Sequence, residues 1–301
     1  MTERGPDRPT LAAYACLVTI AGTNFVAVRF SNAELAPFWG ATLRFAIAGA
    51  LFFAVMAIRR AAVPRGRALV GVLVYGTLGF GASYALLYWA LQTVPAGLAS
   101  VVIALVPLLT FLLAAAHGLE PFRMRGLVGG LIAVAGIAIV FAERLGGDAS
   151  ALGLLACLLG AACIAESSVA AKMFPRVDPS ATNAVGMLAG LAILAPLVIV
   201  ARETPALPAR PETWAALGYL VTIGSIGLFA LFLYVLRRWT ATATSYILVL
   251  APLVTIALGA ALAGERVTAQ FVAGAIVVAL GVYIGALMRG RPAPAPAPRS
   301  P

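Results

Sequence analysis

Long apolar runs separated by short polar links make up nearly the whole chain. An α-helix needs about 20 apolar residues to cross the hydrocarbon core of a bilayer, and runs of that length recur from end to end. Helices are the expected element, because lipid offers no hydrogen-bond partner to a backbone group left unpaired. The pattern predicts ten transmembrane helices, over residues 10–28, 37–58, 67–90, 95–117, 124–142, 151–171, 180–201, 212–236, 240–262 and 268–288.

One stretch of the chain occurs twice, at a separation of 145 residues. The sequence LVPLLT in one copy corresponds to LAPLVT in the other, and each is followed by an apolar run, a glutamate and a second apolar run with glycines. Many special residues share this offset, which indicates an internal duplication. The pairs are Ala96 and Ala241, Ser100 and Ser245, Pro107 and Pro252, Thr110 and Thr255, Glu120 and Glu265, Gly129 and Gly274, and Gly136 and Gly281.

The charged residues predict how the chain is oriented. With both ends in the cytosol, fifteen basic residues fall on the cytosolic side and five on the other, which is the asymmetry expected of membrane proteins. Residues 10–142 form a first half of five helices and residues 151–288 a second half of five. Because five is odd, the second half is inserted upside down, as in alternating-access transporters. Residues 1–9 and the Pro- and Ala-rich segment 289–301 are predicted cytosolic tails.

Composition excludes a soluble protein. The mean hydropathy is +1.01 and 11% of the residues are charged, whereas a soluble domain has about a quarter. The net charge of +10 does not predict nucleic-acid binding, because the arginines lie in the links between spans. Cys16, Cys157 and Cys163 lie inside spans, so no disulfide framework is expected.

Polar residues inside the spans are the candidates for a solute site. Glu166 lies two-thirds along its span, where it would face a cavity and bind an ammonium group or take up a proton. The alternative is a shorter span with Glu166 at the cytosolic interface. Ser167 extends the polar patch. When the first spans of the two halves are aligned with an offset of 143 residues, Glu166 corresponds to Thr23 and Ser167 to Asn24. Both halves therefore have polar residues at the same depth, which favours the cavity.

Arg44, the one basic residue well inside a span, would either bind a carboxylate or hold helix ends through their carbonyls, and the sequence does not separate these roles. Pro107 and Pro252 each remove a helical hydrogen bond, which predicts a kink in each of two equivalent helices and a shaped cavity wall. Ser100 and Ser245 share a helical face with these prolines. That face would line the cavity or pack against another helix.

Aromatic residues form a further candidate group. Tyr84 and Tyr88 are one helical turn apart and would line a mouth that accepts planar side chains, together with Phe229 and Tyr246. Packing in the core or in an interfacial belt is the simpler interpretation of these rings.

Catalytic motifs are not found. His117 is the single histidine, so a histidine metal set or a Ser-His-Asp arrangement has no partners, and no phosphate-binding glycine loop is present. The sequence predicts neither an enzyme nor a bound cofactor or metal.

Two regions resemble a known family. TNFVAVRF, PFWGATLRFAIAGAL and YWALQTVPAGLASVVIALVPLLTFLLAAAHGLE look like an EamA-type member of the drug/metabolite transporter superfamily, and TATSYILVLAPLVTIALGAALAGERVTAQFVAGAIVVALGVYIG is similar to the same repeat. The resemblance implies ten helices, five plus five, and export of amino acids or other small metabolites across the inner membrane. The aromatic amino acid exporters are the nearest subgroup. Arg44 matches a recurrent Arg-Phe pair, and Pro121 stands where the family more often has a basic residue.

The sequence therefore predicts an all-α, multi-pass secondary transporter of the bacterial inner membrane. Its partners are the lipid bilayer, a small solute and, through Glu166, protons, with no nucleic acid. Two alternatives remain: a sugar-phosphate or nucleotide-sugar exchanger of the same fold, and a non-transporting membrane scaffold. We assign the solute carboxylate to Thr23, Asn24, Arg44, Ser100 and Ser245, the ammonium to Glu166, and the side chain to Tyr84, Tyr88 and Phe229.

Overall fold

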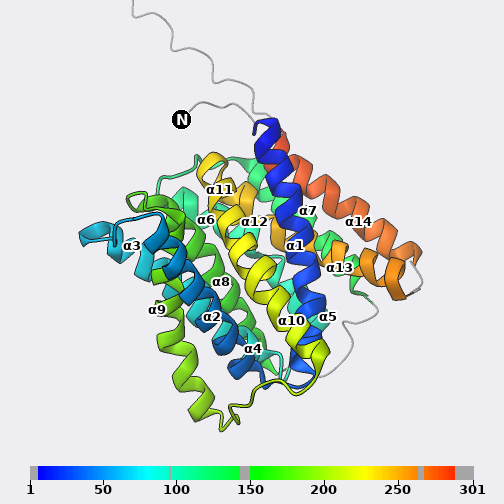
Figure 1. Ribbon diagram of the computed structural model, residues 1–301. Helices are drawn as coiled ribbons and strands as arrows, with labels where there is room; N and C mark the ends of the chain where they lie inside the picture. Colours follow the sequence, from blue (N-terminus) through cyan, green and yellow to red (C-terminus); the bar gives the residue numbers. More distant parts are fainter. Residues whose placement is uncertain (1–5, 95, 143–149, 264–267, 289–301) are drawn as a thin grey trace, which may run out of the picture.

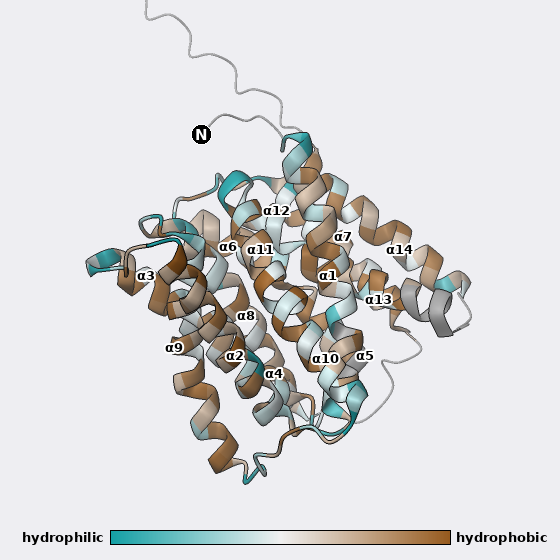
Figure 2. Cartoon of the chain, in the orientation of Figure 1, coloured by the Kyte–Doolittle hydropathy of each residue, from teal (hydrophilic) through white to brown (hydrophobic). Residues whose placement is uncertain are grey.

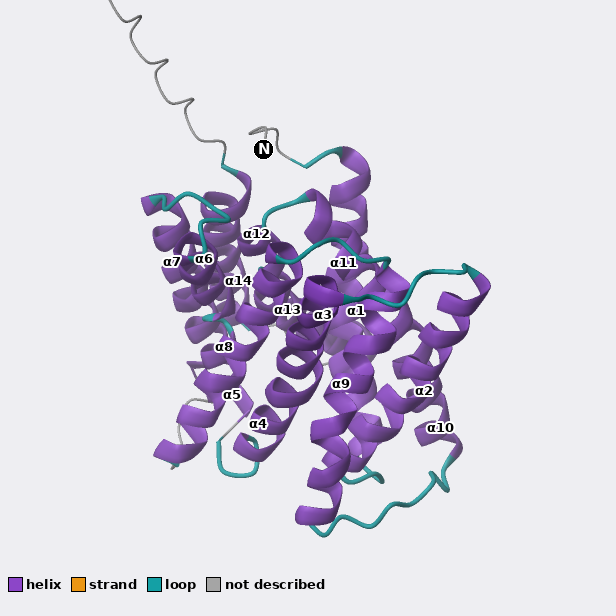
Figure 3. Cartoon of the chain, turned by 90° about the vertical axis from the view of Figure 1, so that its left-hand side faces the viewer, coloured by secondary structure: helices purple, strands orange, loops and turns teal. Residues whose placement is uncertain are grey.

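The computed structural model describes residues 6–94, 96–142, 150–263 and 268–288, and every regular element in these ranges is helical (Figure 3). The first half contains α1 (Arg8–Asn32), α2 (Pro37–Ile58), α3 (Gly66–Gly76), the π-helical turn η1 (Thr77–Ala82), α4 (Ser83–Ala90), α5 (Ala96–Ile103), α6 (Val106–Ala116) and α7 (Met124–Val140).

The second half repeats this order. It contains α8 (Ala151–Met173), α9 (Pro179–Val200), α10 (Pro211–Val221), the π-helical turn η3 (Thr222–Gly227), α11 (Leu228–Arg238), α12 (Ala241–Ser245), α13 (Ile247–Ala263), α14 (Ala269–Val282) and the π-helical turn η4 (Tyr283–Leu287).

Eight helical runs among the described residues are long and apolar enough to cross a membrane. Two shorter apolar helical stretches, Met124–Val140 and Ala241–Ala257, accompany them. Hydrophilic residues gather at the two ends of the bundle and hydrophobic residues cover its middle (Figure 2). The protein is therefore a multi-pass membrane protein.

Helix starts follow from local sequence. Five α-helices begin behind a side chain that accepts a hydrogen bond from a backbone N–H two or three residues on, at Asp7, Ser150, Asp178, Thr240 and Thr268. Such caps satisfy donors that the first helical turn leaves unpaired. Proline lies in the first turn of α1, α2, α6, α9 and α10, where its missing N–H removes no helical bond.

The two halves interlock. The most extensive helix pairs join one half to the other: α7 with α14, α2 with α9, α1 with α13, and α4 with α8. Figure 1 shows α2 of the first half lying beside α9 of the second. Because each half covers the apolar faces of the other, the bundle has its core between the halves.

Glycines allow α7 and α14 to approach closely. A Cβ placed on Gly129 would lie 2.4 Å from the backbone nitrogen of Gly285, and one on Gly281 would lie 2.5 Å from that of Ala133. Gly136 and Gly274 face the same seam. Such close approach is the helix packing that small residues allow in membrane proteins.

The two candidate proline kinks differ in the structure. α5 ends at Ile103 and α6 begins at Val106, so Pro107 lies in the first turn of a new helix. Pro252 lies inside α13, and the interruption in the second half falls earlier, at Tyr246 between α12 and α13. A proline in a first turn removes no helical bond, whereas an interior proline removes one, so the equivalent residues have unequal local effects.

Both described chain ends lie at the same end of the bundle, which we call the terminal end. α1 begins there and α14 runs back toward it (Figure 1), and Pro6 and Leu287 line one cavity. The opposite end, where the link 33–36 and the link 201–210 lie, is the distal end.

Candidate functional site

Equivalent π-helical turns cross the middle of both halves. η1 begins at Thr77 and η3 at Thr222, which is the separation of the sequence duplication. Each turn is approached by a polar residue from the first helix of the other half: a Cβ on Gly79 would lie 3.1 Å from Ser167 Oγ, and one on Gly224 would lie 2.1 Å from Asn24 Oδ1. π-Helical turns are frequent at functional sites.

Arg44 and Asn24 meet at η3. The Arg44 side chain is 4% exposed; its Nε donates to Ser225 Oγ at 2.8 Å and a terminal nitrogen donates to the Gly224 carbonyl at 2.6 Å. Asn24 Nδ2 donates to the same carbonyl at 3.0 Å, and its buried Oδ1 has no hydrogen-bond partner. Two first-half side chains thus hold one second-half carbonyl.

Thr23 lies one residue from this contact, on the same helix. Its hydroxyl shares a hydrogen bond with the Tyr219 hydroxyl of α10 and also contacts the carbonyl of Ile20. Thr23 and Asn24 therefore both connect α1 to the α10–η3 segment of the other half.

Three of the predicted aromatic residues lie in one cluster. The Phe45 ring is surrounded by Tyr84 at 4.9 Å, Phe80 at 5.3 Å and Phe229 at 6.3 Å between centroids. Tyr84 also meets Tyr88 at 5.7 Å, edge to face. Since Arg44 precedes Phe45 and its guanidinium lies 5.3 Å from that ring, the charged and aromatic candidates adjoin.

Tyr246 lies apart from this cluster. It is fully buried in a separate core region with Val249 and Val282, and its hydroxyl lies against Gly285 without a hydrogen-bond partner. The structure does not bring it to the other aromatic candidates.

Glu166 pairs with His117, a residue to which the sequence assigned no role. Its Oε1 lies 3.2 Å from His117 Nε2, and its Oε2 is buried without a hydrogen-bond partner. His117 caps α6, and Glu166 lies about two helical turns before the end of α8. The sequence carried a signal for this pairing, because both residues lie in the cytosolic halves predicted for their spans.

The candidate serines are engaged locally or packed between helices. Ser167 Oγ donates to the Ile164 carbonyl and Ser245 Oγ to the Thr242 carbonyl, which satisfies each hydroxyl within its own helix. Ser100 is partly buried on α5. These three residues lie on three separate helices.

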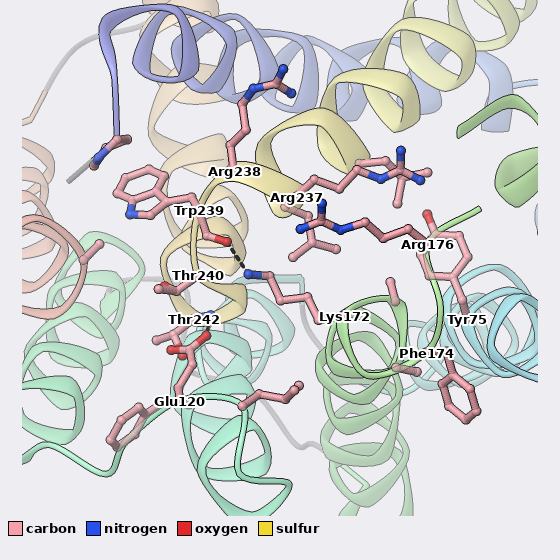
Figure 4. Close-up of a pocket in the computed structure, with 18 of the residues that line it drawn as sticks. Tyr75, Glu120, Lys172, Phe174, Arg176, Arg237, Arg238, Trp239, Thr240 and Thr242 are labelled. Carbon is pink, nitrogen blue, oxygen red and sulfur yellow. Dashed lines mark hydrogen bonds between the residues drawn. The ribbon is translucent and has the colours of Figure 1, made fainter. Parts of the chain in front are cut away.

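A cavity of about 410 Å³ opens between the halves at the terminal end. It is enclosed by α3, the link between α6 and α7, the ends of α8 and α11, the start of α12, and η4 (Figure 4). None of the residues predicted to bind solute lines it. Its lining is strongly basic, with one acid, Glu120; the basic residues are Arg123, Arg125, Lys172, Arg176, Arg237 and Arg238.

Backbone contacts fix several of these side chains. Lys172 Nζ donates to the Trp239 carbonyl, as Figure 4 shows, and a terminal nitrogen of Arg237 donates to the Val177 carbonyl. Glu120 Oε1 accepts from the backbone nitrogen of Thr242 at 3.1 Å, so a first-half carboxylate meets the start of a second-half helix.

At the distal end, two carboxylates tie the halves together. Glu203 accepts from the backbone nitrogens of Phe38 at 3.1 Å and Trp39 at 2.6 Å, at the start of α2. Glu34 accepts from the backbone nitrogen of Ala209 at 2.5 Å. Hydrogen bonds, first from Thr213 and then from Ala209, hold the pKa of Glu34 below its ordinary value.

Comparison with known proteins gives the family. The model of the EamA-like transporter family matches residues 10–142 and 151–286. The chain is 30% identical over 288 residues to the uncharacterized inner membrane transporter YedA of Escherichia coli (strain K12), covering 92% of each chain. It is 27% identical over 282 residues to a probable amino-acid metabolite efflux pump of Salmonella typhimurium (strain LT2), covering 89% of this chain and 91% of the pump.

A solved crystal structure has the same fold. It superposes with a TM-score of 0.80 at 24% sequence identity, covering 93% of this chain and 97% of its own. The family match extends over both halves of the chain. The protein belongs to the EamA-like transporter family.

Proposed function

We propose that the protein exports amino acids or related small metabolites from the cytosol across the bacterial inner membrane by alternating access. The observation that carries the proposal is a difference between the two ends of the bundle. A cavity lies between the halves at the terminal end, whereas hydrogen bonds join the links to the other half at the distal end. Alternating access requires such a difference, because a transporter exposes its central site to one side at a time.

The proposed topology has ten transmembrane helices in two inverted halves, residues 10–142 and 151–288, with both chain ends in the cytosol. The terminal cavity then faces the cytosol, from which an exporter takes its solute. The charge asymmetry of the links supports this orientation, and the packing of α2 on α9 and of α7 on α14, which pairs equivalent helices, supports the two-half arrangement.

The proposed central site lies where Arg44 and Asn24 meet the Phe45 cluster. The guanidinium would receive a solute carboxylate, and the rings of Tyr84, Tyr88 and Phe229 would receive a large neutral side chain. Glu166 would receive the ammonium group or a proton, with His117 as its partner. The name of the Salmonella relative, a probable amino-acid metabolite efflux pump, supports this substrate class.

Transport by purified protein in liposomes tests the proposal. We expect saturable movement of phenylalanine, tyrosine or tryptophan, with a rate that depends on an imposed pH gradient. Replacement of Glu166 by Gln should abolish the gradient effect, whereas the same replacement at the exposed Glu212 should leave it intact. Rates equal to those of protein-free liposomes across all amino acids would refute amino-acid export.

A further inference from the structure

We propose that the terminal cavity contains an anion site, formed by Lys172, Arg176 and Arg237, that holds the carboxylate or phosphate group of a solute. This inference rests on the proposed function only in naming the exported solute as the occupant. The site is distinct from the Arg44 region, because Arg44 does not line this cavity.

The three cations come together from two helices of the second half and the link that follows one of them. Lys172 is near the end of α8, Arg176 follows in the link to α9, and Arg237 is in the last turn of α11. Arg176 lies close enough to both of the others to interact with them electrostatically. Figure 4 shows the three side chains along one region of the cavity, with Glu120 apart from Arg176 and Arg237.

Acidic neighbours do not balance these charges. Glu120 acts on Lys172, and Asp178 acts on Arg237 from outside the cavity lining. Arg176 has no ion pair or hydrogen bond within the described part of the chain. Like charges gathered in a partly enclosed space repel one another more strongly than in bulk water, and an anion between them relieves the repulsion.

The positive-inside rule alone does not explain this arrangement. Arg65 and Arg67 at the same end are exposed and lie outside the cavity lining, where they satisfy the rule with full hydration. Lys172, by contrast, extends from a spanning helix into the partly buried space between the halves, and Arg176, although exposed, lies with it in the cavity lining. The position of Lys172 has a cost in desolvation that topology does not require.

Hydrogen-bond donors remain available for a ligand. Lys172 has three N–H groups and the described contacts use one, for the Trp239 carbonyl. Arg237 uses one terminal nitrogen for the Val177 carbonyl, and the five donors of Arg176 have no protein acceptor among the described residues. A fork of donors of this kind matches a carboxylate or a phosphate.

Binding to purified full-length protein in a non-ionic detergent tests the site. Isothermal titration uses three probes: N-acetylphenylalanine, which has a carboxylate and no ammonium; phenylalanine amide, which has the reverse; and inorganic phosphate. We expect at least one of the two anions to bind and the amide not to bind at this site. Arg176→Gln should weaken anion binding about tenfold, as expected for loss of a charge-assisted hydrogen bond.

The controls separate the site from a general charge effect. Arg67→Gln changes the net charge equally at the same end of the bundle, outside the cavity, and should leave the affinity unchanged. Lys172→Gln is the second test variant, and size-exclusion profiles verify that each variant is folded. Equal anion affinity in wild type, Arg176→Gln and Lys172→Gln, or binding of neither anion by wild type, would overturn the proposal.

Two further arms identify the source of the anion and keep the two proposals independent. Competition by short-chain phosphatidylglycerol, but not phosphatidylcholine, through Arg176 would assign the site to a lipid headgroup; competition by the free solute alone would assign it to the solute. Anion binding without amino-acid uptake would leave the site standing and refute amino-acid export. Saturable uptake with unchanged anion binding in both cavity variants would leave amino-acid export standing and refute the anion site.

Discussion

The two ends of the bundle differ in the charges that lie between the halves. At the distal end, Glu34 and Glu203 accept hydrogen bonds from backbone N–H groups across the halves. At the terminal end, Glu120 makes a contact of the same kind, but Lys172, Arg176 and Arg237 of the second half also face a cavity together. The carboxylates hold the halves together, whereas the three cations repel one another around the terminal cavity until an anion enters.

The largest expected effect is at the distal end. Glu203→Ala removes the acceptor of two N–H groups at the start of α2, and loss of such a cap costs about 1–2 kcal/mol. The link 201–210 should then separate from α2 more often. In a cysteine-free background, a cysteine replacing Ala206 should react about tenfold faster with a membrane-impermeant maleimide, since 1.4 kcal/mol is a factor of ten.

Glu212 gives the matched control for this labelling experiment. It is exposed in the first turn of α10 at the same end, so Glu212→Ala removes a carboxylate without releasing α2. Identical labelling rates for the Glu203 and Glu212 variants would show that the carboxylate tie does not close the distal end.

A smaller effect is expected from the His117–Glu166 pair, toward the terminal end. Both side chains are partly exposed, at 35% and 27%, and exposed ion pairs contribute at most about 1 kcal/mol. His117→Gln should therefore change the transport rate at fixed pH by no more than about fivefold, and chiefly alter the response of transport to an imposed pH gradient. Transport rates in liposomes with and without the gradient provide the measurement. A gradient response that coincides with wild type would exclude the pair from proton coupling.

The smallest effect is expected at Asp178, beside the cavity. Burial raises the pKa of this carboxyl, but hydrogen bonds from Ser180 and the charge of Arg59 at 3.6 Å outweigh it, so the pKa lies below its ordinary value of 3.8. A depressed pKa in the folded state stabilises the fold above the unfolded pKa, and this contribution is lost as the pH falls through the folded value.

Asp178→Asn keeps an N-cap oxygen but loses the charge. The variant should be less stable than wild type by under about 1 kcal/mol at pH 7, and the difference should disappear below about pH 3. Thermal unfolding in detergent at pH 7, 5 and 3 measures it. A difference that persists at the lowest pH would show that the carboxylate charge is not responsible.

Hydrophobic run lengths located the helices well. The predicted span 37–58 is α2, Pro37–Ile58, and the predicted span 151–171 is extended by two residues in α8. Helix ends were predictable because prolines, glycines and capping residues lie next to apolar runs. The different outcomes at Pro107 and Pro252 were not predictable, because the repeat gives both the same local pattern and tertiary packing decides where each helix breaks.

The candidate site was likewise predictable in part. Depth along a span was enough to select Arg44, Asn24 and Glu166 as polar residues in an apolar setting. The partners that the structure gives them, the Gly224 carbonyl and His117, required the packing of one half on the other. Lys172, Arg176 and Arg237 entered the sequence interpretation only as topology charges, because their shared cavity depends on three-dimensional proximity of links far apart in sequence.

The π-helical turns change the direction in which side chains point farther along the same helix. A π-helical turn holds one residue more than an α-helical turn, and one residue corresponds to about 100° of rotation. The side chains after η1 are therefore out of phase with those before it, and the rings of Tyr84 and Tyr88 reach Phe45 and Phe38 only with that shift. Deleting a single residue from η1 would turn both rings by about 100° while leaving the helix apolar and unbroken.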